Sequence, residues 1–211
     1  MASSSSKKVN VVERSQSLPP GTMISESEVA KTLKMGRTPI REAIARLKHI
    51  GFVEVHPRRG VLGSGVDVIR HLELLEVRRP LEECVVRHAV ERGTKEELDA
   101  VQAIARELTE AAKATDRIQY FHAKRNLHEA EVSAANNEVL TRTMEALHAQ
   151  SPRFWYTYEP TDSFPSGARL HSAIANQVAK RNAEGAVAAV ASLFGFLERL
   201  TWNALDRRPR E

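Results

Sequence analysis

Residues 25–60 constrain the fold of this 211-residue chain more than any other stretch, because they contain two helix-start signals only a few positions apart. The first signal is Ser25 followed by Glu28, a capping box in which each side chain can bond the backbone N–H of the other residue. Apolar residues follow at helical spacing, so we expect a short helix over residues 26–34. Gly36 is predicted to end that helix.

The second signal is Thr38-Pro39, which places a capping hydroxyl before a proline at the first helical position, where the missing N–H costs nothing. Apolar residues then recur at spacings of four and three, at Ile40, Ile44 and Leu47, as one buried helix face requires. The pattern therefore predicts a second helix joined to the first by a turn of about four residues.

A hairpin is predicted directly after the second helix. Residues 52–55 alternate as a strand does, residues 56–60 supply turn chemistry, and Val61-Leu62 can return as the partner strand. Arg58 and Arg59 would form its tip. Two helices and a basic hairpin predict a winged helix-turn-helix, which lays its second helix in the major groove of DNA.

Basic side chains gather at the start of the second helix, where backbone N–H groups and the helix dipole favour phosphate. Base edges would meet the first turn of this helix first. The predicted DNA-contacting residues are Arg37, Thr38, Arg41, Arg46, Arg58, Arg59 and Gly60. The alternative is an ordinary solvated face on a small helical subdomain, which would require the helix-start signals and the basic hairpin to coincide by accident.

The charge distribution favours DNA binding. Residues 1–68 hold 11 Lys+Arg and 6 Asp+Glu, whereas the remaining 143 residues hold 20 and 21. The chain has a formal net charge of +4, and its basic excess lies wholly in the predicted DNA-binding part, as counterion release from phosphates requires.

The composition, 42% hydrophobic and 27% charged, is that of a globular protein. A linker at Gly63-Ser64-Gly65 predicts two domains, over residues 1–66 and 67–211. No apolar run approaches membrane-spanning length, the serine-rich start lacks the apolar region of a signal peptide, and the single cysteine, Cys84, excludes an internal disulfide framework. We therefore expect a cytoplasmic protein with no membrane partner.

The second domain is predicted to be all-helical, which makes the fold class mainly α. Thr94, Asp116 and Asn137 provide capping signals for successive helices, and Pro80 is expected to kink or restart the helix before them. Residues 153–167, rich in aromatic side chains, are expected to form a loop with about one helical turn, followed by two long closing helices.

Four N-terminal segments together resemble the DNA-binding domain of the GntR family of bacterial transcription regulators. They are Pro19 to Thr22, Ser25 to Ala30, Gly36 to Ala43 and Leu47 to Gly51. The resemblance implies that Arg37, Thr38 and Arg41 contact the operator and that the wing tip near Arg59-Gly60 enters the minor groove. Gly36 stands where a hydroxyl residue is usual, and Ser27 where some members carry an arginine, so the operator sequence is left open.

Three C-terminal segments resemble the all-helical FCD effector domain of the FadR subfamily. They are Val77 to Glu82, Leu127-His128 with Asn137, and His171 to Ile174 with Asn182 and Ala186. The resemblance implies a ligand-responsive regulator, with release of the operator on ligand binding as the usual outcome for a repressor. Because one helix in one groove buries too little surface for tight binding, we expect a homodimer on a palindromic operator.

Many FCD domains hold a divalent metal through one Asp and three His. His128 and His171 match two of these positions, whereas Lys124 and Leu193 stand in place of the Asp and the last His. Lys124 and His128 lie one helical turn apart, so an ammonium would repel the cation from the position of its anionic ligand. Two imidazoles rarely hold a divalent ion alone. We therefore expect no metal cofactor.

The same positions would favour an anion. Ile118, Phe121 and Val132 are expected to turn the helix face that bears His128 toward the interior. We predict a small carboxylate effector bound by Arg78, Lys124, His128 and His171. Three alternatives stay open: Lys124 extends to solvent while both histidines are hydrogen-bonded core residues, the effector site depends on a metal, or the helical domain only dimerises.

An enzymatic function is not indicated. The chain lacks a metal-ligand set, a phosphate-binding glycine loop and a recognisable triad. Cys84 and His88 share a helix face, but no third group to orient them is apparent, so a core position explains Cys84 better.

Overall fold

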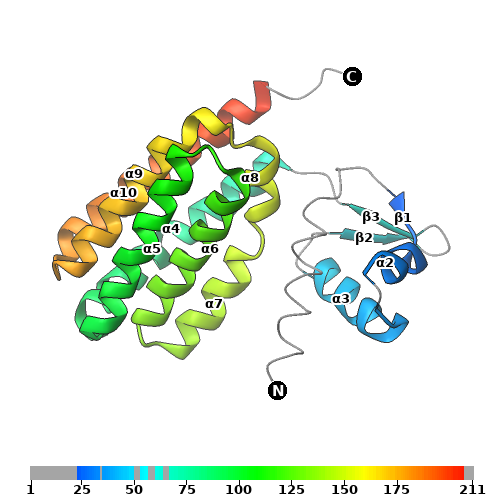
Figure 1. The fold of residues 1–211 in the computed structure, drawn as a ribbon, viewed down its shortest axis with the longest axis horizontal. Coiled ribbons are helices and arrows are strands. Elements are labelled where there is room, and N and C mark those ends of the chain that lie inside the picture. The colour runs from blue at the N-terminus through cyan, green and yellow to red at the C-terminus, as the bar shows by residue number, and fades with distance from the viewer. Residues whose placement is uncertain (1–22, 34, 50–52, 57–59, 64–66, 207–211) are drawn as a thin grey trace. The chain divides into compact units, whose positions relative to one another are not determined.

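The structure is a computed structural model that describes residues 23–33, 35–49, 53–56, 60–63 and 67–206. The chain divides into two compact units (Figure 1). The first comprises residues 1–67 with 149–156, and the second comprises residues 68–148 with 157–211. No helix in the described ranges has the length and apolar character needed to cross a membrane.

The first helix of the N-terminal unit, α2 (Glu26–Leu33), starts at the predicted capping box. The Ser25 N–H donates to the Glu28 carboxylate at 2.8 Å, and the Glu28 N–H donates to the Ser25 hydroxyl at 3.1 Å. These two bonds satisfy backbone donors that the first turn would otherwise leave open. The sequence pattern therefore predicted this start correctly.

The second helix, α3 (Arg37–His49), begins two residues earlier than the Thr38-Pro39 pattern predicts, so Thr38 lies inside its first turn and is not its cap. The Ile40 N–H donates to the Gly36 carbonyl oxygen at 3.4 Å, so Gly36 is the residue before the first turn. Proline remains compatible with this shift because the N–H groups of a first helical turn have no intrahelical partner.

The predicted hairpin is confirmed as β2 (Val53–His56) and β3 (Gly60–Gly63). A third strand, β1 (Met23–Ile24), pairs with the other edge of β3 and gives the sheet order β1-β3-β2. The sequence did not predict β1, since two residues are too few to show an alternation. Gly60 has a φ of 117°, a conformation that side-chain-bearing residues rarely adopt.

A small core joins the helices of this unit to its sheet. Ile40 and Ile44 of α3 pack with Val61 of β3, and all three side chains are buried. Val29, Ala30, Met35 and Val55 cover this cluster. The apolar spacing along the second helix was thus a correct sign of its buried face.

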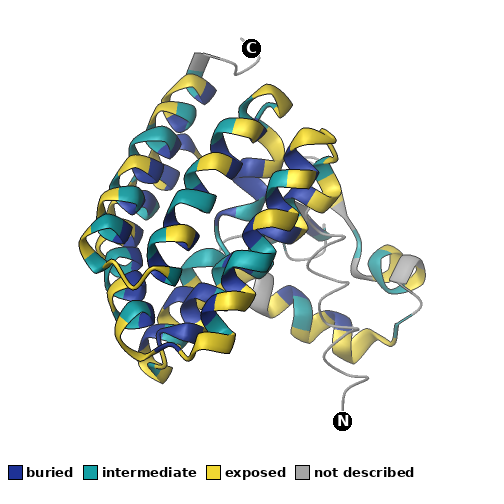
Figure 2. Cartoon of the chain, turned by 60° about the vertical axis from the view of Figure 1, so that its left-hand side comes forward, coloured by how far each residue is buried: buried dark blue, intermediate teal, exposed yellow. Residues whose placement is uncertain are grey.

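The remaining elements are helical, as predicted. In chain order they are α4 (Val68–Arg92), α5 (Lys95–Lys113), α6 (Arg117–Ala134), α7 (Glu138–His148), α8 (Pro152–Tyr158), the 3-10 turn η1 (Thr161–Ser163), α9 (Phe164–Ala179) and α10 (Ala183–Asp206). Within the C-terminal unit α5 packs on α6 and α9, and α10 packs on α4 and α9. The buried positions lie on the sides that these helices turn toward one another (Figure 2).

The predicted caps of this unit are present. Thr94 forms a complete capping box with Glu97, and the Asp116 carboxylate accepts the Gln119 N–H at 3.0 Å. The Asn137 side chain accepts the Leu140 N–H at 3.1 Å. Each cap starts its helix only a few residues after the preceding helix ends.

Among the elements after residue 67, two sequence expectations were wrong, and the expected kink or restart at Pro80 was wrong about the restart. Helix α4 runs without a break through Pro80, so the proline does not restart it. Residues 153–167 contain most of α8, η1 and the first turn of α9 rather than a loop. Ile118 is 72% exposed and does not face the interior. The buried face of α6 includes Tyr120 and Leu127 instead.

The corner between α9 and α10 is closed by Arg181, which has a φ of 54°. Its guanidinium donates to the backbone carbonyl oxygens of Val90 at 2.6 Å and Gly93 at 2.7 Å. These carbonyls lie at the C-terminal end of α4, where the helix itself provides no donor. Arg181 therefore caps α4 from a position 91 residues away from Val90.

Candidate functional site

The predicted DNA-contacting residues that the structure describes lie on the surface of the N-terminal unit. Arg37, Thr38 and Arg41 are exposed at the start of α3, whereas Ile40 is 1% exposed and anchors the helix. The first turn of α3 carries no acidic residue. Helix geometry thus presents two guanidinium groups and a hydroxyl at the end where the helix dipole is positive.

The other predicted contacts fall outside what the structure describes, with one exception. The side chain of Arg46 and the whole of Arg58 and Arg59 are not among the described residues. Gly60 is described at the start of β3, opposite His56. The assignment of all seven residues to DNA stays a prediction.

The C-terminal unit buries charged and titratable side chains from three of its helices and from the segment after α8. They are His71, Arg78 and Glu82 of α4, Lys124 and Glu131 of α6, His171 of α9 and Glu159. Charged side chains are rarely buried without partners, because removal from water disfavours the charged form. Their partners therefore define the chemistry of this region.

One buried ion pair joins Arg78 and Glu82. The Arg78 Nη2 donates to Glu82 Oε1 at 2.7 Å, and His148 Nε2 lies 2.7 Å from the same oxygen. Burial raises the pKa of Glu82, but the attraction and hydrogen bonds of His148 and Arg78 outweigh it and lower that pKa to about 2. Glu82 is therefore a carboxylate that joins α4 to the end of α7.

Three imidazoles lie beside this pair. The His128 ring stacks on His148 with ring centroids 4.6 Å apart, and the His171 ring lies 5.2 Å from His128. Burial, with the nearby charge of Lys124, lowers the pKa of His171 to about 3. Burial and the neighbouring imidazoles hold the pKa of His128 well below its usual value. Both rings are therefore neutral near pH 7.

His171 has unused hydrogen-bonding capacity. Its side chain is 1% exposed, and neither ring nitrogen has a hydrogen-bond partner among the described residues. A neutral imidazole offers one N–H donor and one acceptor. The folded chain leaves both unmade at this position, which is costly unless something else supplies them.

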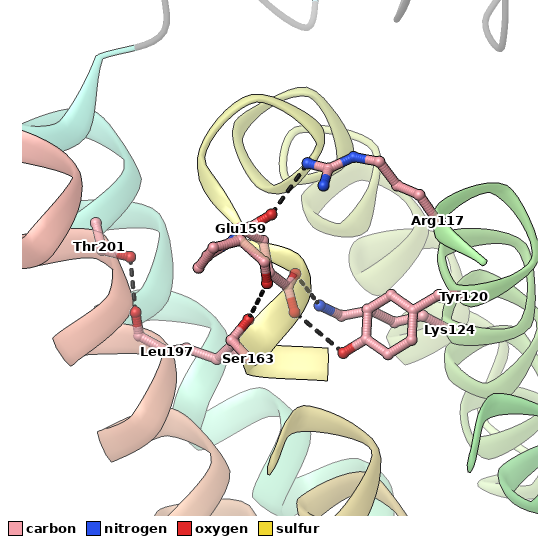
Figure 3. A network of polar contacts seen from close by, with 8 residues as sticks. Arg117, Tyr120, Lys124, Glu159, Ser163, Leu197 and Thr201 are labelled. Atoms are coloured by element: carbon pink, nitrogen blue, oxygen red, sulfur yellow. Dashed lines mark hydrogen bonds and ion pairs between the residues drawn. The ribbon is translucent and has the colours of Figure 1, made fainter. Parts of the chain in front are cut away.

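A second buried ion pair joins Lys124 to Glu159 (Figure 3). The Lys124 Nζ donates to Glu159 Oε2 at 2.9 Å, and the Tyr120 hydroxyl donates to Oε1 at 3.0 Å. The Arg117 Nη2 donates to the backbone carbonyl oxygen of Glu159 at 3.0 Å. Burial and the Glu159 charge raise the pKa of Tyr120, so its hydroxyl stays protonated as a donor.

Each of the two units matches a known protein family. Residues 14–62 match the family described as bacterial regulatory proteins, gntR family, and residues 73–196 match the FCD domain. The chain belongs to the GntR family. Its FCD domain makes it a member of the FadR type, as the sequence motifs predicted.

Relatives of this GntR-family chain are named as regulators rather than enzymes. It is 30% identical over 128 residues to the Nta operon transcriptional regulator of Aminobacter aminovorans, covering 61% of this chain and 60% of that protein. It is 28% identical over 155 residues to the HTH-type transcriptional regulator McbR of Escherichia coli strain K12, covering 73% of this chain and 69% of that protein. The chain thus spans less than two thirds of the length of the Nta regulator.

A solved structure shows the same fold for this GntR-family chain. The E. coli McbR/YncC structure has a TM-score of 0.82 at 20% sequence identity, and the match covers 94% of this chain and 98% of that one. This likeness supports the fold of both units.

The four predicted effector residues of this FCD domain lie close enough to influence one another electrostatically. The charges of Arg78 and Lys124 both help lower the pKa values of His128 and His171. Lys124 does not extend to solvent, because its side chain is 7% exposed and bonded to Glu159. The histidines are not both hydrogen-bonded core residues within the described part of the chain either, since neither nitrogen of His171 has a partner there. Their role in effector binding stays a prediction.

Sequence reasoning missed the two carboxylates that neutralise these cations. Glu82 follows Arg78 by four positions, a helical spacing that could have revealed the pair. Glu159 is 35 residues from Lys124, in a segment whose pattern indicated a loop, and no sequence signal connects them.

The residues present do not fit the metal that many FCD domains hold. Lys124 and Leu193 occupy two of the ligand positions, and Leu193 is a buried apolar side chain. Across the described ranges no group of three or more His, Cys, Asp or Glu side chains could hold a metal ion. The rings of His128 and His148 stack on each other, with centroids 4.6 Å apart.

Proposed function

We propose that this chain is a DNA-binding transcriptional repressor whose operator affinity is controlled by a small carboxylate bound in the FCD domain. The observation that carries the proposal is the start of α3, where Arg37, Thr38 and Arg41 are exposed on a helix anchored by Ile40 and Ile44. Arginine is the side chain best suited to bidentate contacts with guanine in the major groove.

Operator recognition requires two such helices. A single helix buries too little surface for tight, specific binding, so two copies of the chain would place their α3 helices about 34 Å apart on a palindrome. DNA selected from a random pool by the purified full-length protein should yield a sequence with dyad symmetry. Light scattering should give a dimer at micromolar concentration. A monomer whose selected sites lack symmetry would contradict the proposal.

His171 supports a ligand in the FCD domain. Burying an imidazole whose two nitrogens have no hydrogen-bond partner among the described residues costs free energy. A bound ligand with one donor and one acceptor would supply both hydrogen bonds. His128 lies next to His171, with ring centroids 5.2 Å apart, and the buried cations Arg78 and Lys124 of the same unit would favour an acid.

A thermal-shift screen of small organic acids tests this half of the proposal. An acid that raises the melting temperature should also release a labelled operator in fluorescence anisotropy, and His171→Leu should reduce both effects. Val178→Leu, a buried position two helical turns further along α9, is the matched control. A domain that only dimerises would show no stabilisation by any acid in the screen.

A further inference from the structure

Glu159 is held in the C-terminal unit as a bound carboxylic acid would be. Its side chain is fully buried, and its two oxygens accept one bond from the Lys124 ammonium and one from the Tyr120 hydroxyl. Figure 3 shows both donors reaching from α6 toward Glu159, which lies in the segment between α8 and α9. The ammonium and the neutral hydroxyl give each oxygen of the carboxylate one donor, and the ammonium also balances its charge.

The binding partners of Glu159 are positioned by other parts of the fold. Arg117, Tyr120 and Lys124 follow one another at spacings of three and four, so they form one stripe of α6. The Tyr120 ring stacks on Phe164, with ring centroids 3.9 Å apart and an angle of 10° between the planes. Helices α6 and α9 therefore fix the positions of the donors, and Glu159 binds to them.

Gly167 of α9 lies directly against the Tyr120 hydroxyl. A Cβ atom at this position would lie 2.4 Å from the Tyr120 hydroxyl oxygen and 3.6 Å from Glu159 Oε1. Any side chain there would push the hydroxyl away from the carboxylate. The absence of a side chain at position 167 thus leaves room for a donor aimed at a carboxylate.

We propose that Lys124 and Tyr120 form a carboxylate subsite that Glu159 occupies as a tethered internal ligand, and that an acidic effector enters this subsite by displacing Glu159. The inference deepens the proposed function and rests on it only for the identity of the displacing acid. The subsite itself follows from the two donors and the room that Gly167 provides.

Displacement sets a requirement on the effector. A tethered ligand competes at an effective concentration in the millimolar range or above, so an acid with only one carboxylate contact cannot replace it at low concentration. His171 offers the second contact, because neither ring nitrogen has a hydrogen-bond partner among the described residues. Its ring centroid lies 5.2 Å from that of His128, which follows Lys124 by one turn of α6. The effector class is therefore a small acid with a further hydrogen-bonding group, rather than a simple monocarboxylate.

The decisive experiment removes the internal ligand and supplies a free one. In full-length Glu159→Ala, sodium formate at saturation should raise the melting temperature by about 5–10 °C over sodium chloride of equal ionic strength. Wild-type protein should show no difference between the two salts, because its subsite is filled. The double variant Glu159→Ala/Lys124→Met should lose the formate effect.

Glu131→Ala is the matched control. Glu131 is a buried carboxyl group of α6. Its burial and the neighbouring charge of Glu82 raise its pKa well above the usual value. Deleting this side chain therefore opens a similar space without exposing a cation. Formate should not stabilise this variant beyond chloride. Equal effects of formate on Glu131→Ala and Glu159→Ala would overturn the proposal, since they would show a general effect of cavities.

A second variant covers poor folding of the first. Glu159→Ser leaves a hydroxyl that water can solvate, and its refolding yield with and without formate gives the same comparison. If neither variant folds in formate, or both fold without a formate-specific gain, the subsite does not exist. Operator binding is measured separately on wild-type protein, so loss of the proposed function and loss of the subsite give different results.

Discussion

The two units of this chain use cationic side chains in opposite ways. In the N-terminal unit Arg37 and Arg41 are exposed at the start of a helix, where an external polyanion can reach them. In the C-terminal unit Arg78 and Lys124 are buried, and each is bonded to a carboxylate of the same chain. The first arrangement leaves its cations exposed to solvent, whereas the second already contains its counter-charges.

The difference between the units should appear first in stability. Lys124→Met leaves the Glu159 carboxylate buried without its ammonium, so the free energy of unfolding should fall by about 3–5 kcal/mol. The exposed counterpart, Arg41→Ala, should change it by less than about 0.5 kcal/mol. Urea denaturation measures both.

A double variant sharpens this stability comparison. Lys124→Met/Glu159→Leu removes both charges and should recover most of the loss, because a well-packed apolar pair can replace a buried ion pair. A double variant as unstable as Lys124→Met would mean that the loss comes from packing rather than from the unpaired carboxylate.

The second prediction concerns the exposed cations alone. Arg37→Ala or Arg41→Ala should weaken binding to the selected operator by about 1–3 kcal/mol and change base preference. Lys48→Ala, an exposed position later in α3, should weaken all sequences similarly and reduce the salt slope by about one. Anisotropy titrations at several salt concentrations separate the two kinds of contact. Unchanged operator affinity in both arginine variants would remove α3 as the reading helix.

The third prediction uses the pH dependence of the buried unit. His171 has a pKa of about 3 in the folded state, against an ordinary value near 6.5. Between these two pKa values the histidine is protonated in the unfolded chain but neutral in the folded chain. The free energy of unfolding therefore falls as the pH is lowered. From pH 7 to pH 5 this histidine alone accounts for at most about 2 kcal/mol.

Other buried groups modify that profile. His128 acts in the same direction as His171 because its pKa is also lowered. Glu131 opposes them, since its raised pKa means that stability is lost as the pH rises. Glu82, with a pKa of about 2, contributes a loss only below about pH 4.5. His171→Leu should therefore reduce the fall in the free energy of unfolding between pH 7 and pH 5. His122→Leu, at an exposed position, controls for the loss of an imidazole. An unchanged slope in His171→Leu would argue against a buried neutral His171.

The smallest expected effect is that of a chelator on the melting temperature, which should be none. Purified protein should contain less than one equivalent of zinc, nickel or manganese by elemental analysis, because an ammonium and a leucine replace two ligands. Lys124→Asp should raise metal affinity by placing a carboxylate beside His128 and His171. Stoichiometric metal in wild-type protein that is lost in His128→Ala would contradict this prediction.

The sequence predicted local features of the fold well. Capping boxes at Ser25 and Thr94 and the spacing of Ile40 and Ile44 involve residues within one or two helical turns, so the chain itself shows the contact. It failed for β1, which has no pattern of its own, and for Ile118, whose apolar character suggested an inward position that Tyr120 and Leu127 fill instead.

The candidate sites follow the same division. Arg37, Thr38 and Arg41 could be chosen from one short segment, because a helix start and its charge are local properties. The cations of the helical domain were found as well, but Glu159 and the stacking of His148 on His128 were not. These contacts join elements that become neighbours only when the bundle packs, and no short-range periodicity encodes them.

Arg181 shows how one residue can restrict the evolution of a corner. A glycine there would adopt the φ of 54° with less strain, yet it would abandon the carbonyls of Val90 and Gly93. A lysine could reach one carbonyl as a point charge, but it lacks the planar fork that serves both. Backbone ease and long-range bonding therefore demand different amino acids at position 181, and a change that improves one weakens the other. Engineering for heat resistance would gain little from the usual substitution of glycine at a left-handed corner.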